Sequence, residues 1–118
     1  MEHSTKSLAR MQQGVDNLTE FDCHNVRGCF ALSRMGTGIL REPYKTEFNA
    51  GLWDRKIDYV VYSYQTPIGW HTTEGVWTVP DTRYSVTTTN HQRTLRTAID
   101  NPGFYEMLHE HVSGTRVM

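Results

Sequence analysis

The sequence predicts a single α+β domain: an N-terminal helix, an antiparallel sheet of about four strands with a central hairpin, and two short C-terminal helices. Three observations support this fold class. An apolar stripe at helical spacing comes first, the strand patterns gather between residues 25 and 80, and helix-start signals follow them. The chain of 118 residues has the length of one domain and no internal repeats, so we expect residues 1–118 to form that domain.

The first elements follow from two different periodicities. Between residues 4 and 19, apolar residues from Leu8 to Leu18 recur at spacings of three and four, which predicts a helix with one apolar face. Between residues 25 and 34, apolar and polar positions alternate from Val26 onward, which is typical of a half-buried strand. Residues 41–54 contain Pro43 and an Asn-Ala-Gly cluster, so we expect a long connection there.

The densest strand signals lie between residues 57 and 80. Both faces of residues 57–64 are apolar or aromatic, which predicts a central strand. Residues 68–73 and 76–80 then form a hairpin around Glu74-Gly75. This register predicts that His71 faces away from the core, and that four apolar residues share the core face: Ile68, Trp70, Trp77 and Val79.

The helical signals return after residue 85. Thr89 with Gln92 three residues later matches a capping box, which predicts a helix from there to about Ile99. His91 falls on the inner stripe of this helix, whereas the arginines at 93 and 96 point outward. Asp100-Asn101-Pro102 then predicts the start of a last helix, with an apolar face that begins at Phe104.

The composition limits the classes of function. The formal net charge is -1, so no global field attracts the protein to nucleic acid or to an anionic membrane. Hydrophobic residues make up 37% of the chain, which predicts a thin core completed by Tyr, Trp and Thr. No apolar run approaches the roughly 20 residues of a membrane span, and the N-terminus does not resemble a signal peptide. We therefore expect a cytoplasmic protein without a membrane partner.

Metal and cofactor signals are weak in this sequence. Cys23 and Cys29 suit free thiols in a reducing compartment, and no second pair follows to complete a zinc site with them. His109 and His111 are two residues apart, so they point to different faces of a helix. We predict no metal site and no cofactor.

A longer pattern carries a resemblance. It consists of Tyr62-x-Tyr64-x-Thr66-Pro67-Ile68-x-Trp70, then Trp77-x-Val79-Pro80, then Tyr84-Ser85-x-Thr87-Thr88-x-x-His91-Gln92. This pattern resembles a family of small uncharacterised proteins carried by bacteriophages, notably those of actinobacteria, and by related mobile elements. The similarity covers roughly residues 57 to 97. It implies a phage-type accessory protein that acts in the cytoplasm of a bacterial host, and it implies no reaction.

Three classes of function remain, and binding to a host protein comes first. A Tyr- and Trp-rich sheet with one covered face presents aromatic anchors on the other, and the hairpin edge at residues 76–80 also offers a route to a homodimer. The alternative is nucleic-acid binding, in which the tyrosines stack on bases and the arginines and the helix N-terminus meet phosphates. The predicted binding residues for these two classes are Tyr62, Tyr64, Arg83, Tyr84, Thr88, His91, Arg93 and Arg96.

An enzyme is the third class. It would use a hydroxyl of Ser85, Thr87 or Thr88 as nucleophile and His91 as base. The sequence offers no evident acid to orient the histidine and no Gly-x-Ser-x-Gly elbow. We therefore predict no catalytic residue.

Overall fold

The computed structural model describes residues 5–23, 25–31 and 36–103, and within them it has the predicted α+β class. The elements in chain order are α1 (Thr5–Asn17), β1 (Phe21–Cys23), β2 (Val26–Phe30), α2 (Tyr44–Trp53), β3 (Ile57–Ser63), β4 (Thr66–Thr72), β5 (Trp77–Thr78) and α3 (Val86–Asp100). The predicted order of helix, sheet and C-terminal helix is confirmed. The last predicted helix, from Phe104 onward, lies outside the described residues.

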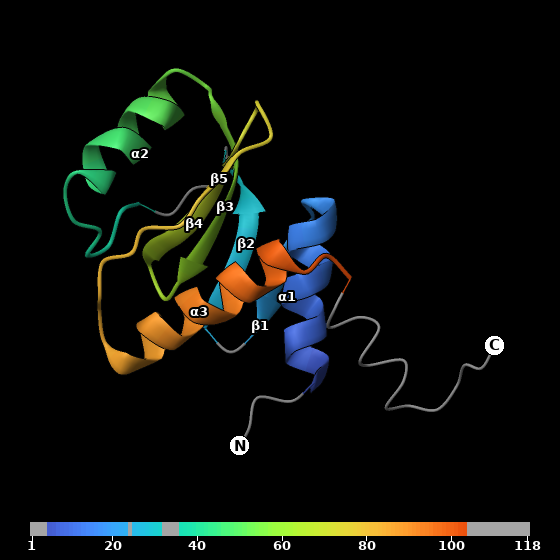
Figure 1. The fold of residues 1–118 in the computed structure, drawn as a ribbon. Helices are drawn as coiled ribbons and strands as arrows, with labels where there is room; N and C mark the ends of the chain where they lie inside the picture. Colours follow the sequence, from blue (N-terminus) through green and yellow to red (C-terminus); the bar gives the residue numbers. More distant parts are fainter. Residues whose placement is uncertain (1–4, 24, 32–35, 104–118) are drawn as a thin grey trace.

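The sheet is a five-stranded antiparallel meander in the order β1-β2-β3-β4-β5, with α2 inserted between β2 and β3. In Figure 1 the sheet lies between α2 on one side and the crossed pair α1 and α3 on the other. The strand β3 is central and its residues are buried on both faces, as its pattern predicts. Sequence reasoning missed β1, since three residues are too few to show alternation.

One face of the sheet packs against α1 and α3. Met11 and Val15 from α1 and Leu95 and Ala98 from α3 meet the sheet in one core cluster. The sheet contributes Val26, Tyr59, Val61 and Ile68. The helix α1 comes close to the sheet because residue 14 is glycine. A Cβ atom there would collide with the Phe21 ring, so this glycine, which lowers helix propensity, permits the close packing.

The other face packs against α2, and here the predicted long connection at residues 41–54 is wrong. Phe48 is fully buried against Trp70, with ring centroids 4.9 Å apart. The rest of this cluster comes from β2, β3 and the segment before α2: Cys29, Leu40, Ile57, Val60 and Tyr62. The helix was not predicted because apolar residues occur on both of its sides, and Pro43 and Gly51 are signals of a loop.

A register shift between β3 and β4 and the observed pairing of β4 with β5 correct the predicted hairpin. The register shifts between Val61 and Tyr62, so Ile68 and Trp70 lie on opposite faces of the sheet. In the hairpin, Trp70 pairs with Thr78 and His71 pairs with Trp77, one residue away from the predicted register. His71 therefore faces the same side as Trp77 instead of turning away from it.

The helix α3 begins at Val86, three residues before the predicted capping residue. Ser85 is its N-cap, and the Ser85 hydroxyl accepts a hydrogen bond from the Thr88 amide at 3.2 Å. Thr89 lies in the first turn instead, where its hydroxyl accepts from the Tyr84 amide at 3.1 Å. No helix in the described part of the chain is long and apolar enough to cross a membrane.

Candidate functional site

The predicted binding residues do not form one surface. Tyr62 is fully buried in the cluster under α2, so it is unavailable to stack on a base or to anchor a partner. Tyr64 is 51% exposed because it lies in the β3–β4 turn with φ of 57°, where the alternation of the strand has ended. The prediction that both rings belong to one contact surface is therefore wrong for Tyr62.

Thr88 and His91 lie together, but in the interior. The Ser63 hydroxyl donates to Thr88 Oγ1 at 3.2 Å and lies 2.7 Å from His91 Nδ1, while the Tyr64 ring lies 6.2 Å from the His91 ring. A hydroxyl against an imidazole is the contact that nucleophilic catalysis requires. Ser63 is only 1% exposed, however, so a substrate has no access to it. We interpret this cluster as a buried polar link between β3 and α3. Sequence reasoning missed Ser63 because it lies 28 residues from His91.

The three predicted arginines differ in their contacts and in their exposure. Arg96 Nη2 donates to the Pro80 carbonyl oxygen at 2.7 Å, so its prediction as an outward phosphate ligand is wrong. Arg93 is exposed and donates to Asn90 Oδ1 at 3.2 Å. Arg83 is exposed too, and the half-buried Tyr84 ring lies 5.5 Å below the Arg41 guanidinium carbon. Of the three predicted arginines, Arg83 and Arg93 are therefore exposed, whereas Arg96 is engaged by the fold.

A row of aromatic side chains crosses the sheet at the end away from Ser63, on the face that carries α1 and α3. It takes one ring from each of four adjacent strands: Phe30, Tyr59, His71 and Trp77. The His71 and Trp77 rings are 5.2 Å apart, and His71 Nδ1 lies 2.8 Å from Asp58 Oδ1. A carboxylate on Nδ1 orients an imidazole. Within the described residues no three or more metal-ligating side chains gather, so this pair lacks the ligands that a metal site needs.

Tyr59, in the middle of this row, serves the fold. Its hydroxyl donates to the Thr19 carbonyl oxygen at 2.6 Å. Burial raises the pKa of the Tyr59 phenol, and the charges of Cys29 and Glu20 add to this effect. The phenol therefore remains a neutral hydrogen-bond donor at any physiological pH.

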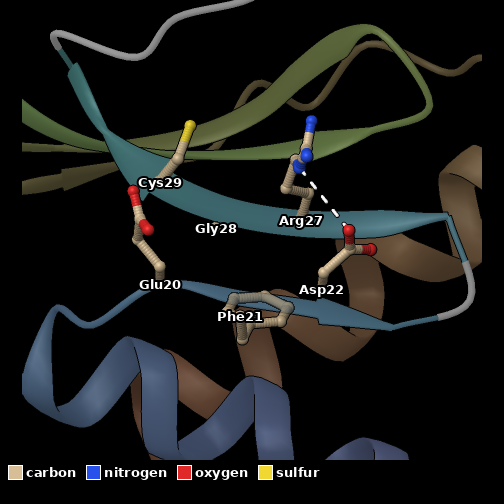
Figure 2. A pocket seen from close by; sticks show the side chains of 6 residues that line it. All are labelled: Glu20, Phe21, Asp22, Arg27, Gly28 and Cys29. Atoms are coloured by element: carbon tan, nitrogen blue, oxygen red, sulfur yellow. Dashed lines mark ion pairs between the residues drawn. The ribbon is translucent and has the colours of Figure 1, made fainter.

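A hollow of about 380 Å³ lies on the β1–β2 hairpin, lined by Glu20, Phe21, Asp22, Arg27, Gly28 and Cys29. Figure 2 shows the side chains of Glu20, Asp22, Arg27 and Cys29 on one side of the hairpin and the Phe21 ring on the other, toward α1. Arg27 Nε lies 3.7 Å from Asp22 Oδ2. Burial raises the pKa of the Cys29 thiol, against a lowering by Arg27, so this cysteine is not an activated nucleophile.

The outer face of α2 is a surface that sequence reasoning missed completely. The helix buries Phe48, and the opposite side consists of exposed, uncharged residues: Thr46, Asn49, Ala50 and Trp53. Trp53 is 87% exposed, although it is among the largest apolar side chains. The spacing from Asn49 to Trp53 is one helical turn, but it signals a common face only once the segment is known to be a helix.

Comparison with known proteins gives one match. The family model described as a family of unknown function (DUF8033) matches residues 9–103, which include α2, α3 and all the strands that the structure describes. No curated protein and no solved structure matches the chain.

Proposed function

Because the chain belongs to this family of unknown function (DUF8033), we propose a function from the structure itself: a non-catalytic binding module that holds a partner protein on the outer face of α2. The observation that carries the proposal is Trp53, whose side chain is 87% exposed. The α2 outer face is defined here as Thr46, Asn49, Ala50 and Trp53.

Packing within the fold does not explain why position 53 is a tryptophan. It belongs to neither of the two core clusters, whereas Leu52 beside it packs against the one that contains Phe48. Tryptophan is enriched among the few residues that supply most of the affinity of protein interfaces. A flat indole at the end of a helix, beside small residues such as Ala50 and Asn49, fits an apolar pocket on a partner.

The chemistry of this face favours a protein over a nucleic acid. Contact with a phosphate backbone requires clustered cations, and the α2 outer face has no charged residue, with Lys45 on one flank and Glu47 on the other. Most surface helices direct charged and polar residues to water. An uncharged outer face with a tryptophan is typical of a helix that packs on both sides.

The nucleic-acid alternative loses support for a separate reason. Tyr62 and Thr88 are buried, and Arg96 binds the Pro80 carbonyl, so three of its contact groups are engaged in the fold. Arg83 and Arg93 remain exposed. The resemblance to phage-carried proteins extends the proposal: the partner is a bacterial host protein, and the contact forms in the host cytoplasm.

Capture from a host lysate tests the proposal. The tagged protein, Trp53→Ala and Val86→Ala are each used as bait, with and without nuclease treatment. Val86 is the matched control because it is 78% exposed and lies at the opposite end of the sheet, at the start of α3. We expect one defined protein that survives nuclease, is kept by Val86→Ala and is lost by Trp53→Ala.

Purified components then complete the test. With the captured protein added, amide hydrogen exchange should slow in residues 44–56, and the affinity should fall at least roughly tenfold for Trp53→Ala, as for an interface hot spot. Equal capture by the Trp53→Ala protein would contradict the proposal. Nuclease-sensitive capture would instead support nucleic-acid binding.

A further inference from the structure

A second surface, separate from the α2 outer face, lies at the free edge of β1. In the described part of the chain, β1 is the edge of the sheet and pairs only with β2. The Asn25 carbonyl accepts a hydrogen bond from the Tyr64 amide, so the backbone carbonyl of Asn25 points toward β3. Alternate residues of an antiparallel strand direct their backbone groups to the same neighbouring strand, so those of Arg27 also point toward β3. Asp22 pairs with Arg27. Its amide and carbonyl therefore point away from β2, toward the open edge.

Two hollows flank this edge, one on each side of the hairpin. The first is the hollow of about 380 Å³ that holds Glu20, Asp22 and Cys29 (Figure 2). The second, about 300 Å³, lies between α1 and β1 and is lined by Arg10, Gln13, Gly14, Thr19, Glu20, Phe21 and Asp22. Successive side chains of a β-strand point to opposite faces. A strand added beside β1 therefore places alternate side chains in the two hollows.

We propose that the β1 edge binds an extended peptide segment of another protein by strand addition, with Lys or Arg side chains directed into the hollow beside Glu20 and Asp22. The backbone groups of Asp22 supply the pairing, and the carboxylates select the charge. The Arg27–Asp22 pair does not prevent this, because the two side chains are 46% and 70% exposed and ion pairs at the surface contribute little.

The same charges argue against a second copy of this chain as the occupant. Two β1 strands paired edge to edge would bring the carboxylates of Glu20 and Asp22 from both copies onto the same short stretch of sheet. Like charges across neighbouring strands are destabilising. The occupant is therefore a different chain with basic residues at alternate positions.

Three capped hexapeptides test the proposal on the full chain. They alternate Thr with Lys, Thr with Glu, and Thr with Lys carrying an N-methyl group on every second amide. Binding is followed by amide chemical shifts of the isotope-labelled protein. We expect the Thr-Lys peptide to shift residues 20–22 and 27–29, and to bind roughly tenfold more tightly than either other peptide. The Thr-Glu peptide carries the opposite charge, and the N-methylated peptide lacks the amide donors of one edge.

Two variants locate the contact. Asp22→Pro removes the outward amide without removing a β1–β2 hydrogen bond, and we expect it to abolish binding. Asp22→Asn keeps the amide, and we expect it to weaken binding only about threefold. Should Asp22→Pro fail to fold, the N-methylated peptide makes the same distinction on the unaltered protein.

Four outcomes would overturn the proposal. They are no binding of the Thr-Lys peptide, equal binding of the N-methylated peptide, shifts confined to other residues, and a concentration-dependent dimer that Asp22→Pro disrupts. The last of these would assign the edge to a second copy.

Discussion

The helices α2 and α3 pack on opposite faces of the same sheet, and they use their side chains in opposite ways. In α3, polar side chains are committed to the fold: Gln92 and Arg96 both donate to the Pro80 carbonyl, and His91 contacts Ser63. The helix α2 is held mainly by the packing of Phe48 against Trp70, and its outer residues, Trp53 included, are exposed.

This difference shows that a residue type typical of binding sites is available to a partner only when the fold does not already use its side chain. A run of Thr, His, Gln and Arg suggests a binding site in the sequence, yet in α3 most of these groups satisfy buried partners. A buried polar group needs a hydrogen bond, and the fold supplies it from distant segments. Trp53 carries the opposite signature, since a large apolar side chain left in water gains free energy only from a partner.

The largest expected effect on stability is in the core between the sheet and α2. Trp70→Ala should lower the free energy of unfolding by about 3–5 kcal/mol, because it leaves a cavity beside Phe48 in a thin core. Trp77→Ala, at a half-buried position on a two-residue edge strand, should cost clearly less. Denaturant titration of both variants measures the difference. Equal losses would mean that the two rings share one environment, against the observed register.

An intermediate effect is expected at the Pro80 carbonyl. Gln92→Ala should cost about 1–3 kcal/mol, because it removes a buried hydrogen bond of 2.9 Å and leaves a space at a fully buried position. Arg93→Ala, one residue along and exposed, is the matched control and should change stability by less than about 0.5 kcal/mol. Thermal melts that rank the two variants in the reverse order would contradict this account of α3.

A smaller effect is expected at the start of α3. Ser85→Ala should cost about 1 kcal/mol through the loss of the N-cap. In α2 the N-cap residue Pro43 makes no side-chain hydrogen bond, and the preceding Glu42 accepts from the Thr46 amide at 3.0 Å instead. Circular dichroism melts of Ser85→Ala and Thr89→Ala test the assignment. A larger loss for Thr89→Ala would place the cap at Thr89, as the sequence pattern predicts.

The parts of the fold that the sequence predicts are those with a simple period. The strand at 57–63 is evident because apolar residues fill both faces, and α1 because its stripe repeats at helical spacing. The helix α2 shows no such period. The opposite faces of Ile68 and Trp70 depend on a bulge in the β3–β4 pairing, and the hairpin register depends on a three-residue turn with Gly75 at φ of 85°. Both are decided by packing that no local pattern contains.

The candidate surfaces were harder to predict for a related reason. Tyr62 and Tyr64 share one side of an ideal strand, but the strand ends at Ser63, so one ring is buried and the other exposed. Arg96 lies one turn after Gln92, and it points inward only because the segment around Pro80 runs alongside α3. The β1 edge and the α2 outer face belong to elements that the sequence did not predict.

The smallest expected change in stability is the most informative one. Trp53→Ala should alter the free energy of unfolding by less than about 0.5 kcal/mol, because the indole is 87% exposed and surface substitutions have small effects. It should also remove the tryptophan emission that acrylamide quenches most readily, since Trp70 is buried and Trp77 half-buried. Melting curves and quenching titrations of the parent and the variant measure both effects. A loss of 2 kcal/mol or more, on the scale of a core substitution, would mean that Trp53 packs within the molecule. In that case its exposure would no longer support a partner on α2, and the contrast between the two helices would disappear.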